Sequence, residues 1–366
     1  MKWTNFLLLF AFILFFGCSG KNSKEINIGA NLPLSGTVAY YGLSAQKGIN
    51  LALKELNQKG FTNNLKIKMV YEDNQGQAKS AITVMDKLIN IDKVPVIIGG
   101  GSSVETLAAA PVANQNKIAL LSPISSASKI TLAGPYIYRT CPTDNIQAED
   151  LGKWVLENKY KTVSIVFVNS TWATSFKDDF VKNFQNNGGI VSKIESSDPG
   201  DTDFRTQLIS LKKSKKDALV FIIYAKEGGA IVRQAKELGM NEPIFGADPW
   251  SQEDFRNSAG KFAENVHYTT PVQYDGQTFK EFRDKYFKEY NEEPDVYSSN
   301  GYDCLMIIAK ALESGARTGD EIKNYFDKQT GFMGATGLTK FDGNGDVVGK
   351  HFGRFVIKNG TSIQIN

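Results

Sequence analysis

Two turns rich in glycine and serine follow neighbouring apolar stretches of this sequence, and their chemistry suits an anion. The first reads GGGSS (99–103) and the second reads SPISSA (122–127). Glycine lets a ligand approach the backbone closely, and the free N–H groups at the start of a helix attract negative charge. Ser103 and Ser126 would add hydroxyl groups. An ordinary helix cap at Ser103 explains the first turn equally well.

Later turns carry a different set of side chains. Trp172 follows one predicted strand, Tyr224 a second and Asp248 a third. Two aromatic faces and a carboxylate complement the serine-rich turns, because together they match the carboxylate, ammonium and side chain of an amino acid. We therefore expect one half of the molecule to offer hydroxyl and N–H groups, and the other half to offer aromatic rings and the carboxylate. By itself, an aspartate in a turn is usually a turn or capping residue.

The inventory of reactive residues argues against catalysis. The 366 residues include only two histidines, His267 and His351, and no glycine-rich phosphate loop of the GxxxxGK[ST] type. A rival hypothesis, an enzyme with a doubly wound fold, would need a nucleophile and base, a phosphate loop or a metal site. We therefore predict a protein without catalytic residues, cofactor or metal.

One short motif resembles a calcium loop. Asp342, Asn344 and Asp346 have the spacing of its first three ligands. However, Val347 and Gly353 stand where the loop needs glycine and glutamate. A hairpin turn at DGNG explains the motif better.

Charge and cysteine content narrow the class of protein further. The formal net charge is +3, and the densest basic run, KKSKK (212–216), is too short for a nucleic-acid footprint. We therefore expect no nucleic-acid partner. Beyond the N-terminus, Cys141 and Cys304 have no metal-ligand spacing. They are either buried free thiols or a disulfide in an exported protein.

These turns must be positioned by alternating strands and helices. Apolar runs at 26–34, 65–72, 94–99 and 117–122 predict strands, with helices at 43–58, 77–91 and 104–114 between them. A second series places strands at 163–169, 190–196, 218–224 and 243–246, again with helices between them. This order predicts an α/β fold with two doubly wound, mostly parallel sheets. About 350 residues also exceed what one core usually holds.

The N-terminus predicts export. Residues 6–16 are uniformly apolar, which suits a signal peptide and is too short for a membrane span. Gly17-Cys18 after this run resembles the signal of bacterial lipoproteins, although Phe15 and Phe16 depart from its usual residues. We expect a signal peptide at 1–17, lipidation of Cys18 and a tether at 18–25, on the extracytoplasmic side of a bacterial membrane. The alternative is a plain secretory signal with an incidental cysteine.

Almost the whole mature chain, from about 26 to 355, resembles the leucine/isoleucine/valine-binding protein family. These are type I periplasmic binding proteins that serve branched-chain amino acid ABC transporters. The resemblance is carried by IGANLPLSGTVAYYG, YEDNQGQAKSAITVMDKLI, YIYRT, IVRQAKELGM and FGAD, and above all by VIIGGGSSVETLAAAPVANQNKIALLSPISSA.

The resemblance implies specific ligand contacts. The ligand carboxylate would be held by Ser103 and Ser126, and its ammonium by the carbonyl of Ile124 and by Asp248. Aromatic walls would fall on Tyr41, Trp172 and Tyr224.

Two of these positions differ from the family pattern. Asp248 stands where the family often has glutamate, and Trp172 where it commonly has tyrosine. These differences favour a re-proportioned pocket for a smaller side chain or for a ring.

The family also implies an architecture and partners. Lobe one would comprise 26–141 plus 272–349, and lobe two 142–271 plus 350–366, joined by three hinge strands near 140–143, 270–272 and 349–352. The lobes would close on a free amino acid, branched-chain or otherwise apolar, and a monomer would deliver it to permease subunits of an ABC transporter. Related proteins bind amides, urea or aromatic acids, or act as sensor domains, which is the alternative function.

Overall fold

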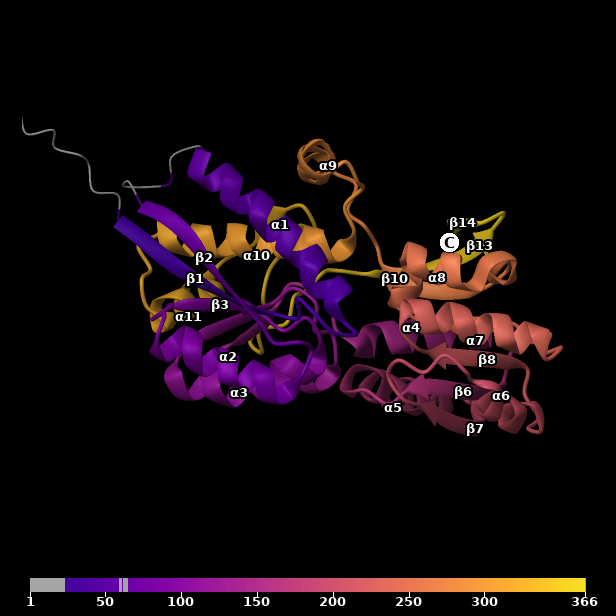
Figure 1. Ribbon diagram of the computed structural model, residues 1–366. Coiled ribbons are helices and arrows are strands. Elements are labelled where there is room, and N and C mark those ends of the chain that lie inside the picture. The colour runs from indigo at the N-terminus through magenta and orange to yellow at the C-terminus, as the bar shows by residue number, and fades with distance from the viewer. Residues whose placement is uncertain (1–23, 59–60, 62–64, 366) are drawn as a thin grey trace, which may run out of the picture.

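The computed structural model describes residues 24–58, 61 and 65–365. It contains two large sheets, each covered by helices (Figure 1), and a small two-stranded sheet of β11 (Phe332–Gly334) and β12 (Gly337–Thr339). We call the body around the first sheet the first lobe and the body around the second sheet the second lobe. The predicted α/β class with two lobes is confirmed. The predicted signal peptide, Cys18 and most of the tether lie outside the described residues. Within the described part of the chain, no helix has the length and apolar character needed to cross a bilayer.

The first sheet is entirely parallel, with the strand order β2-β1-β3-β4-β5. Its central strands β3 and β4 are fully buried, as their uninterrupted apolar sequences predict. β1 begins at Lys24, two residues earlier than expected and inside the predicted tether, because Lys24 pairs with Leu65 of β2. The strands are β1 Lys24–Leu32, β2 Leu65–Asp73, β3 Val96–Gly99, β4 Ala119–Ser122 and β5 Ile137–Arg139.

Helices cover both faces of this sheet. α2 (Ala78–Asn90) and α3 (Ser103–Asn116) pack on the sheet face that carries the buried side chains of Ile97 and Leu120. The opposite face, with Ile28 and Ile98, is covered by α1, by α9 and by two helices from late in the chain. These four helices are α1 Ala39–Gln58, α9 Gln277–Tyr290, α10 Val296–Glu313 and α11 Gly319–Lys328.

α1 and α10 lie in direct contact although about 250 residues separate them. A Cβ atom at Gly48 would stand 1.8 Å from the carbonyl oxygen of Ser298, and one at Gly301 would stand 2.4 Å from that of Ala45. Only glycine permits this approach of two helix backbones. The contact joins the late segment of the first lobe, which contains α10, to the early segment, which contains α1.

The second sheet has the order β14-β13-β10-β9-β8-β6-β7. The strands β6, β7, β8, β9 and β10 are parallel, whereas β13 and β14 run antiparallel at one edge, so this sheet is mixed and not purely parallel. The strands are β6 Thr162–Val168, β7 Ile190–Ser197, β8 Ala218–Ile222, β9 Ile244–Gly246, β10 His267–Pro271, β13 Phe352–Lys358 and β14 Thr361–Ile365.

Helices cover both faces of the second sheet as well. α4 (Asp144–Glu157) and α5 (Thr171–Asn186) pack on one face, against Ile165 and Val220. The other face, with Val166 and Phe221, is covered by α6 Arg205–Lys212, α7 Ala225–Glu237 and α8 Glu253–Ala259.

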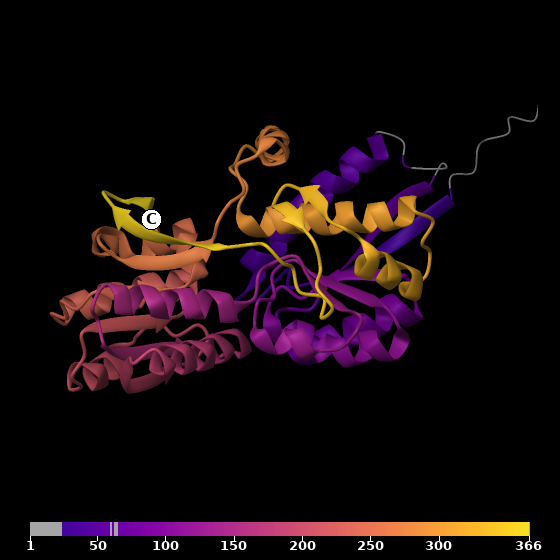
Figure 2. The ribbon, with the colours of Figure 1, turned by 180° about the vertical axis from the view of Figure 1, so that it is seen from behind.

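The chain passes between the two sheets three times, and Figure 2 shows the late segments crossing back toward β13. The passages lie between β5 and α4, between β10 and α9, and before β13. Lys350 ties two of them together, because its Nζ donates to the carbonyl oxygen of Thr140 and to Oγ1 of Thr336, at 2.7 Å each. The exact lobe boundaries and their action as hinges stay a prediction.

Cys141 and Cys304 are both free and buried, so no disulfide joins them. This is the first of the two alternatives. Burial raises the pKa of Cys141 to about 12. Because the thiolate is the reactive form, this thiol is inert at neutral pH.

The DGNG motif forms a turn, as expected. Phe341 pairs with Val347, and the N–H of Gly345 donates to the carbonyl oxygen of Asp342 at 3.1 Å. Asp342 Oδ1 accepts the N–H groups of Asn344 and Asp346. Among the described residues, no group of three or more acidic, histidine or cysteine side chains is arranged to hold a metal ion.

Candidate functional site

One cavity between the two lobes brings together all seven residues expected to contact a ligand. Its empty volume, counting the part open to solvent, is about 350 Å³. The expected residues that line it are Tyr41, Ser103, Ile124, Ser126, Trp172, Tyr224 and Asp248, and they are joined by Gly101, Ser102, Pro249 and Tyr297.

The glycine-rich turn after β3 brings the backbone to the cavity. Gly100 has a φ of 82°, and a Cβ atom there would stand 1.7 Å from Oγ1 of Thr106. A Cβ atom at Gly101 would stand 2.2 Å from Cδ of Pro33. The turn therefore depends on glycine at both positions, and it leads directly into the first turn of α3, where N–H groups have no partner within the helix.

Ser103 is the first residue of α3, and Ser102 occupies the N-cap position without a side-chain capping bond. The capping explanation for Ser103 is therefore wrong. Its hydroxyl oxygen accepts the N–H of Ala127 at 3.2 Å, which links the two serine-rich turns. The proton of the hydroxyl remains able to donate, so Ser103 can bind an anion while it holds Ala127 in place.

Ser122 shapes the second turn, which presents Ile124 and Ser126 to the cavity. Its hydroxyl accepts the N–H groups of Ile124 and Ser125, and donates to the carbonyl oxygen of Gly100 at 3.0 Å. The helix that follows is the short 3₁₀ helix η2, Ser128–Leu132. The two turns thus form one hydrogen-bonded unit.

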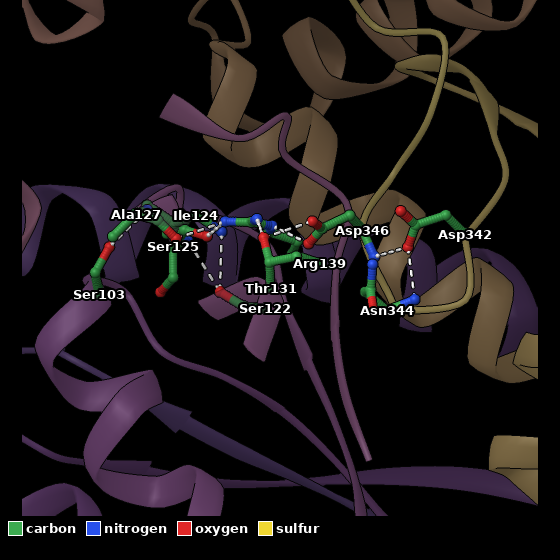
Figure 3. A network of polar contacts seen from close by, with 10 residues as sticks. All are labelled: Ser103, Ser122, Ile124, Ser125, Ala127, Thr131, Arg139, Asp342, Asn344 and Asp346. Atoms are coloured by element: carbon green, nitrogen blue, oxygen red, sulfur yellow. Dashed lines mark hydrogen bonds and ion pairs between the residues drawn. The ribbon is translucent and has the colours of Figure 1, made fainter. Parts of the chain in front are cut away.

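Arg139 anchors this unit from behind, a role that the sequence did not reveal (Figure 3). The side chain is fully buried, and its Nη1 donates to the carbonyl oxygen of Ala127 at 2.9 Å. Its Nε donates to Asp346 Oδ1 at 2.6 Å, and its Nη2 to Thr131 Oγ1 at 2.8 Å. The aspartate of the DGNGD motif therefore compensates a buried arginine. The stretch YIYRT and the DGNGD motif were both visible in the sequence, but nothing there connects them.

Asp248 supplies negative charge at the opposite side of the cavity. It lies after β9, at the start of the 3₁₀ helix η3 (Asp248–Ser251). Its Oδ2 accepts the hydroxyl of Tyr297 at 3.4 Å, while its Oδ1 is buried and finds no partner in the described part of the chain. Burial raises the pKa of Asp248 to about 6. An unpaired buried carboxylate is costly, so this oxygen is suited to a cationic donor.

Aromatic rings form the remaining walls. Trp172 and Tyr224 of the second lobe stack with centroids 5.2 Å apart and an interplanar angle of 24°. The ring centroid of Tyr41 lies 6.1 Å from that of Tyr224 and 5.0 Å from that of Tyr297, and the rings of Tyr41 and Tyr297 meet edge to face. Aromatic rings therefore come from both lobes, because Tyr41, which the family resemblance implied, comes from α1 and Tyr297 from α10.

The sequence did not indicate Tyr297, because this residue does not follow a strand but lies in the first turn of α10. Asp295 caps that helix, since its Oδ1 accepts the N–H of Ser298 at 2.7 Å in a reciprocal capping box. A capping aspartate ahead of an aromatic residue was therefore the available signal. Because Tyr297 does not follow a strand, the sequence did not indicate that it lines the cavity.

The chain is similar to known periplasmic binding proteins over most of its length. The model of a family described as "Periplasmic binding protein" matches residues 25–354. The leucine-, isoleucine-, valine-, threonine- and alanine-binding protein of Pseudomonas aeruginosa is 26% identical over 328 residues, which cover 89% of this chain and 88% of that protein.

Two solved structures have the same fold over almost the whole chain. The branched-chain amino acid transporter substrate binding protein LivJ of Streptococcus pneumoniae, in complex with isoleucine, has a TM-score of 0.85 and 30% identity, covering 93% of this chain and 100% of that one. The solute binding protein of an ABC transporter from Rhodopseudomonas palustris, in complex with 3,4-dihydroxybenzoic acid, has a TM-score of 0.83 and 25% identity, covering 93% and 96%.

Proposed function

The chain belongs to the leucine/isoleucine/valine-binding protein family of periplasmic binding proteins, and from this premise we propose that it captures a free amino acid between its lobes for an ABC transporter. The ligand of this proposal is branched-chain or otherwise apolar. The protein acts as a binding component without catalytic residues.

One observation carries this proposal. A single small cavity has hydroxyl groups and a helix start on one side, at Ser103 and Ser126, and a buried unpaired carboxylate oxygen of Asp248 on the other. An α-amino acid carries a carboxylate and an ammonium on one carbon, so it can satisfy both sides at once. The carbonyl of Ile124, which also lines the cavity, is the proposed second acceptor for the ammonium.

The aromatic walls support an apolar side chain. The rings of Trp172, Tyr224, Tyr41 and Tyr297 line the rest of the cavity. Burying an apolar side chain there gains about 25 cal/mol for each Å² removed from water. Because Trp172 and Tyr224 are stacked on each other, they narrow the space and favour a smaller aliphatic group.

The proposed mechanism is a shift in population between open and closed lobes. Residues 26–141 plus 272–349 form one moving body, and 142–271 plus 350–366 form the other. A ligand favours closure only through contacts that the open form lacks. Ser103 and Asp248 lie on different bodies, so a ligand that touches both makes such contacts.

Delivery completes the proposal. Lipidation of Cys18 would hold the protein at the extracytoplasmic face of a bacterial membrane, and the tether would let the closed monomer reach the permease subunits. Two or more buried acyl chains hold a protein firmly, because each buried methylene contributes about 0.8 kcal/mol.

A second candidate ligand is an aromatic acid. The stacked pair of Trp172 and Tyr224 offers ring faces, and the Rhodopseudomonas palustris relative is in complex with 3,4-dihydroxybenzoic acid. Such a ligand would use Ser103 and Ser126 but would leave Asp248 without a cation.

A thermal-shift screen separates the candidates. The mature protein is first unfolded and refolded to remove any retained solute, then tested against the twenty amino acids and against benzoate, 4-hydroxybenzoate and 3,4-dihydroxybenzoate. We expect a rise in Tm with one or more aliphatic amino acids and none with the acids that lack an amino group. A rise with the aromatic acids alone would replace the amino-acid proposal.

A further inference from the structure

A second cavity adjoins the ligand cavity on the side of the passages between the two sheets. Its empty volume, counting the part open to solvent, is about 300 Å³. Residues in or next to all three passages line it, namely Cys141, Pro142, Pro271 and Phe352. The residues that line both cavities are Ile124, Ser126, Asp248 and Tyr297, so the two cavities meet at these four residues.

Both proposed acceptors of the ligand's ammonium group lie at this junction. The carbonyl of Ile124 and the carboxylate of Asp248 belong to the shared lining, whereas Ser103, a proposed partner of the ligand carboxylate, lines the first cavity alone. The ammonium end of the ligand therefore lies toward the second cavity. An ammonium group has three N–H donors, and two acceptors leave the third donor without a partner.

Asn300 is a polar side chain in the second cavity that can serve this third donor. The residue is only 2% exposed, and its side chain makes no hydrogen bond within the described part of the chain. The other carboxamide in the cavity is engaged, because Nε2 of Gln147 donates to the carbonyl oxygen and to Oγ1 of Thr269 at 2.8 and 3.1 Å. A buried amide without a partner is costly, so Asn300 is suited to a ligand.

Two contacts of α10 fix the position of Asn300. Tyr297, Asn300 and Cys304 follow one another at intervals of three and four residues, so they share one face of the helix. The hydroxyl of Tyr297 donates to Asp248 Oδ2 at 3.4 Å, and Sγ of Cys304 lies 3.5 Å from Oγ1 of Thr140, beside the first passage. Asn300 lies between these two contacts, and it therefore faces the space between Asp248 and the first passage.

We propose that Asn300 is the third acceptor of the ligand's ammonium group, with its Oδ1 accepting the hydrogen that Asp248 and Ile124 leave free. This inference rests on the proposed function, because it requires a ligand with an amino group. It also assigns a specificity. An N-methylated amino acid has one N–H donor fewer and places a methyl group against the amide of Asn300, so the site selects primary amines.

Asn300→Leu tests the role of the amide, because leucine has nearly the same shape and cannot form a hydrogen bond. Isothermal titration calorimetry is carried out with L-leucine, or with whichever of the twenty amino acids binds most tightly. We expect its affinity to fall by about tenfold or more. The Tm of the ligand-free variant should stay the same or rise, because the substitution removes a buried polar group that lacks a partner in the described chain.

The same titrations with the N-methyl derivative of that amino acid test the specificity. The unaltered protein should prefer the primary amine. In Asn300→Leu this preference should shrink by about fivefold or more, because the methyl group then meets an apolar side chain. Asn257→Leu is the matched control, since Asn257 is an exposed asparagine on α8 in the second lobe. It should leave both affinities unchanged.

Asn300→Ala, which only removes atoms, is measured alongside in case leucine does not fit. Failure of both variants to fold, or a loss of affinity that accompanies a lower Tm of the ligand-free protein, would assign Asn300 to the fold and overturn the inference. Equal weakening of the primary and the N-methylated ligand would overturn it as well. If the N-methylated ligand binds neither protein, a loss of affinity for the primary amine at unchanged or higher Tm supports the inference.

Failure of this inference and failure of the proposed function are distinguishable. An amino acid that binds the unaltered protein and Asn300→Leu with equal affinity overturns the role of Asn300 and leaves the proposed function intact. If none of the twenty amino acids binds the unaltered protein, the proposed function fails and the inference fails with it.

Discussion

The hydroxyl of Tyr297 lies 3.4 Å from Oδ2 of Asp248, and this contact joins the two lobes across the ligand cavity. Tyr297 lies in the first turn of α10 in the first lobe, whereas Asp248 follows β9 in the second. The same aspartate leaves its other oxygen buried and, among the described residues, unpaired. The side chain is thus held by one lobe and open to a ligand at the same time.

Asp248→Asn should weaken amino-acid binding by about 2–4 kcal/mol, because the ammonium would lose its charged partner in a buried site. Isothermal titration calorimetry of the two proteins with the same amino acid measures the difference. Asp254→Asn is the control, since Asp254 is an exposed carboxylate on the next helix. Affinity within threefold of the original would contradict the assignment of Asp248 to the ammonium.

Asp346→Asn should destabilise the protein by about 3–5 kcal/mol, because it leaves the buried guanidinium of Arg139 without a countercharge. Urea unfolding measures this loss, and the exposed ion pair of Glu149 and Lys153 supplies the comparison. Glu149→Gln should cost less than about 1 kcal/mol. An equal loss of unfolding free energy in the two variants would contradict a larger contribution from the buried pair of Arg139 and Asp346.

Asp346→Asn should also weaken amino-acid binding. Asp346 holds the side chain of Arg139, which in turn donates to the carbonyl oxygen of Ala127 in the turn that carries Ser126. Calorimetry at a temperature where the variant is fully folded separates this effect from the loss of stability. Unchanged affinity in the folded variant would limit Arg139 to a structural role.

Gly48→Ala tests the contact of α1 with α10. Alanine in place of glycine inside a helix normally stabilises by about 0.5–1 kcal/mol. Here the added Cβ would meet the carbonyl oxygen of Ser298, so we expect the opposite sign, a loss of about 1–3 kcal/mol. Gly343→Ala is the control, because nothing lies within 4 Å of its Cβ position. A stabilised Gly48→Ala protein would show that the helices are not in this contact.

Glu105 should make stability depend on pH. It is buried beside the glycine-rich turn, where it accepts the N–H of Gly101 and a hydrogen from Asn74, and burial raises its pKa to about 7. Because the folded pKa is raised, its stabilising contribution is complete below the unfolded value and is lost as pH rises toward about 7.

Urea unfolding at several pH values between about 5 and 8 measures this loss, and Glu105→Gln removes the group that titrates. The variant should therefore show a flatter dependence of unfolding free energy on pH. Glu149→Gln, which alters an exposed carboxylate, should leave the slope unchanged. The same slope in all three proteins would assign the effect to another group.

The sequence located most of the cavity because parallel strands end at a common edge. Reading the residues after each apolar run reached Ser103, Ile124, Ser126, Trp172, Tyr224 and Asp248, and the family resemblance added Tyr41. It also indicated the α/β class, the inert cysteines as one alternative, and the turn at DGNG. Each of these depends on residues close together in the chain.

What the tertiary structure decided depends on residues far apart in the chain. Tyr297 reaches the cavity because α10 packs on α1, and Arg139 is compensated by Asp346 about 200 residues later. Local patterns of apolar and polar residues report which face of an element is buried, but not which element covers it. Pairing of buried charges is decided only when the lobes assemble, because the cost of burial appears only then.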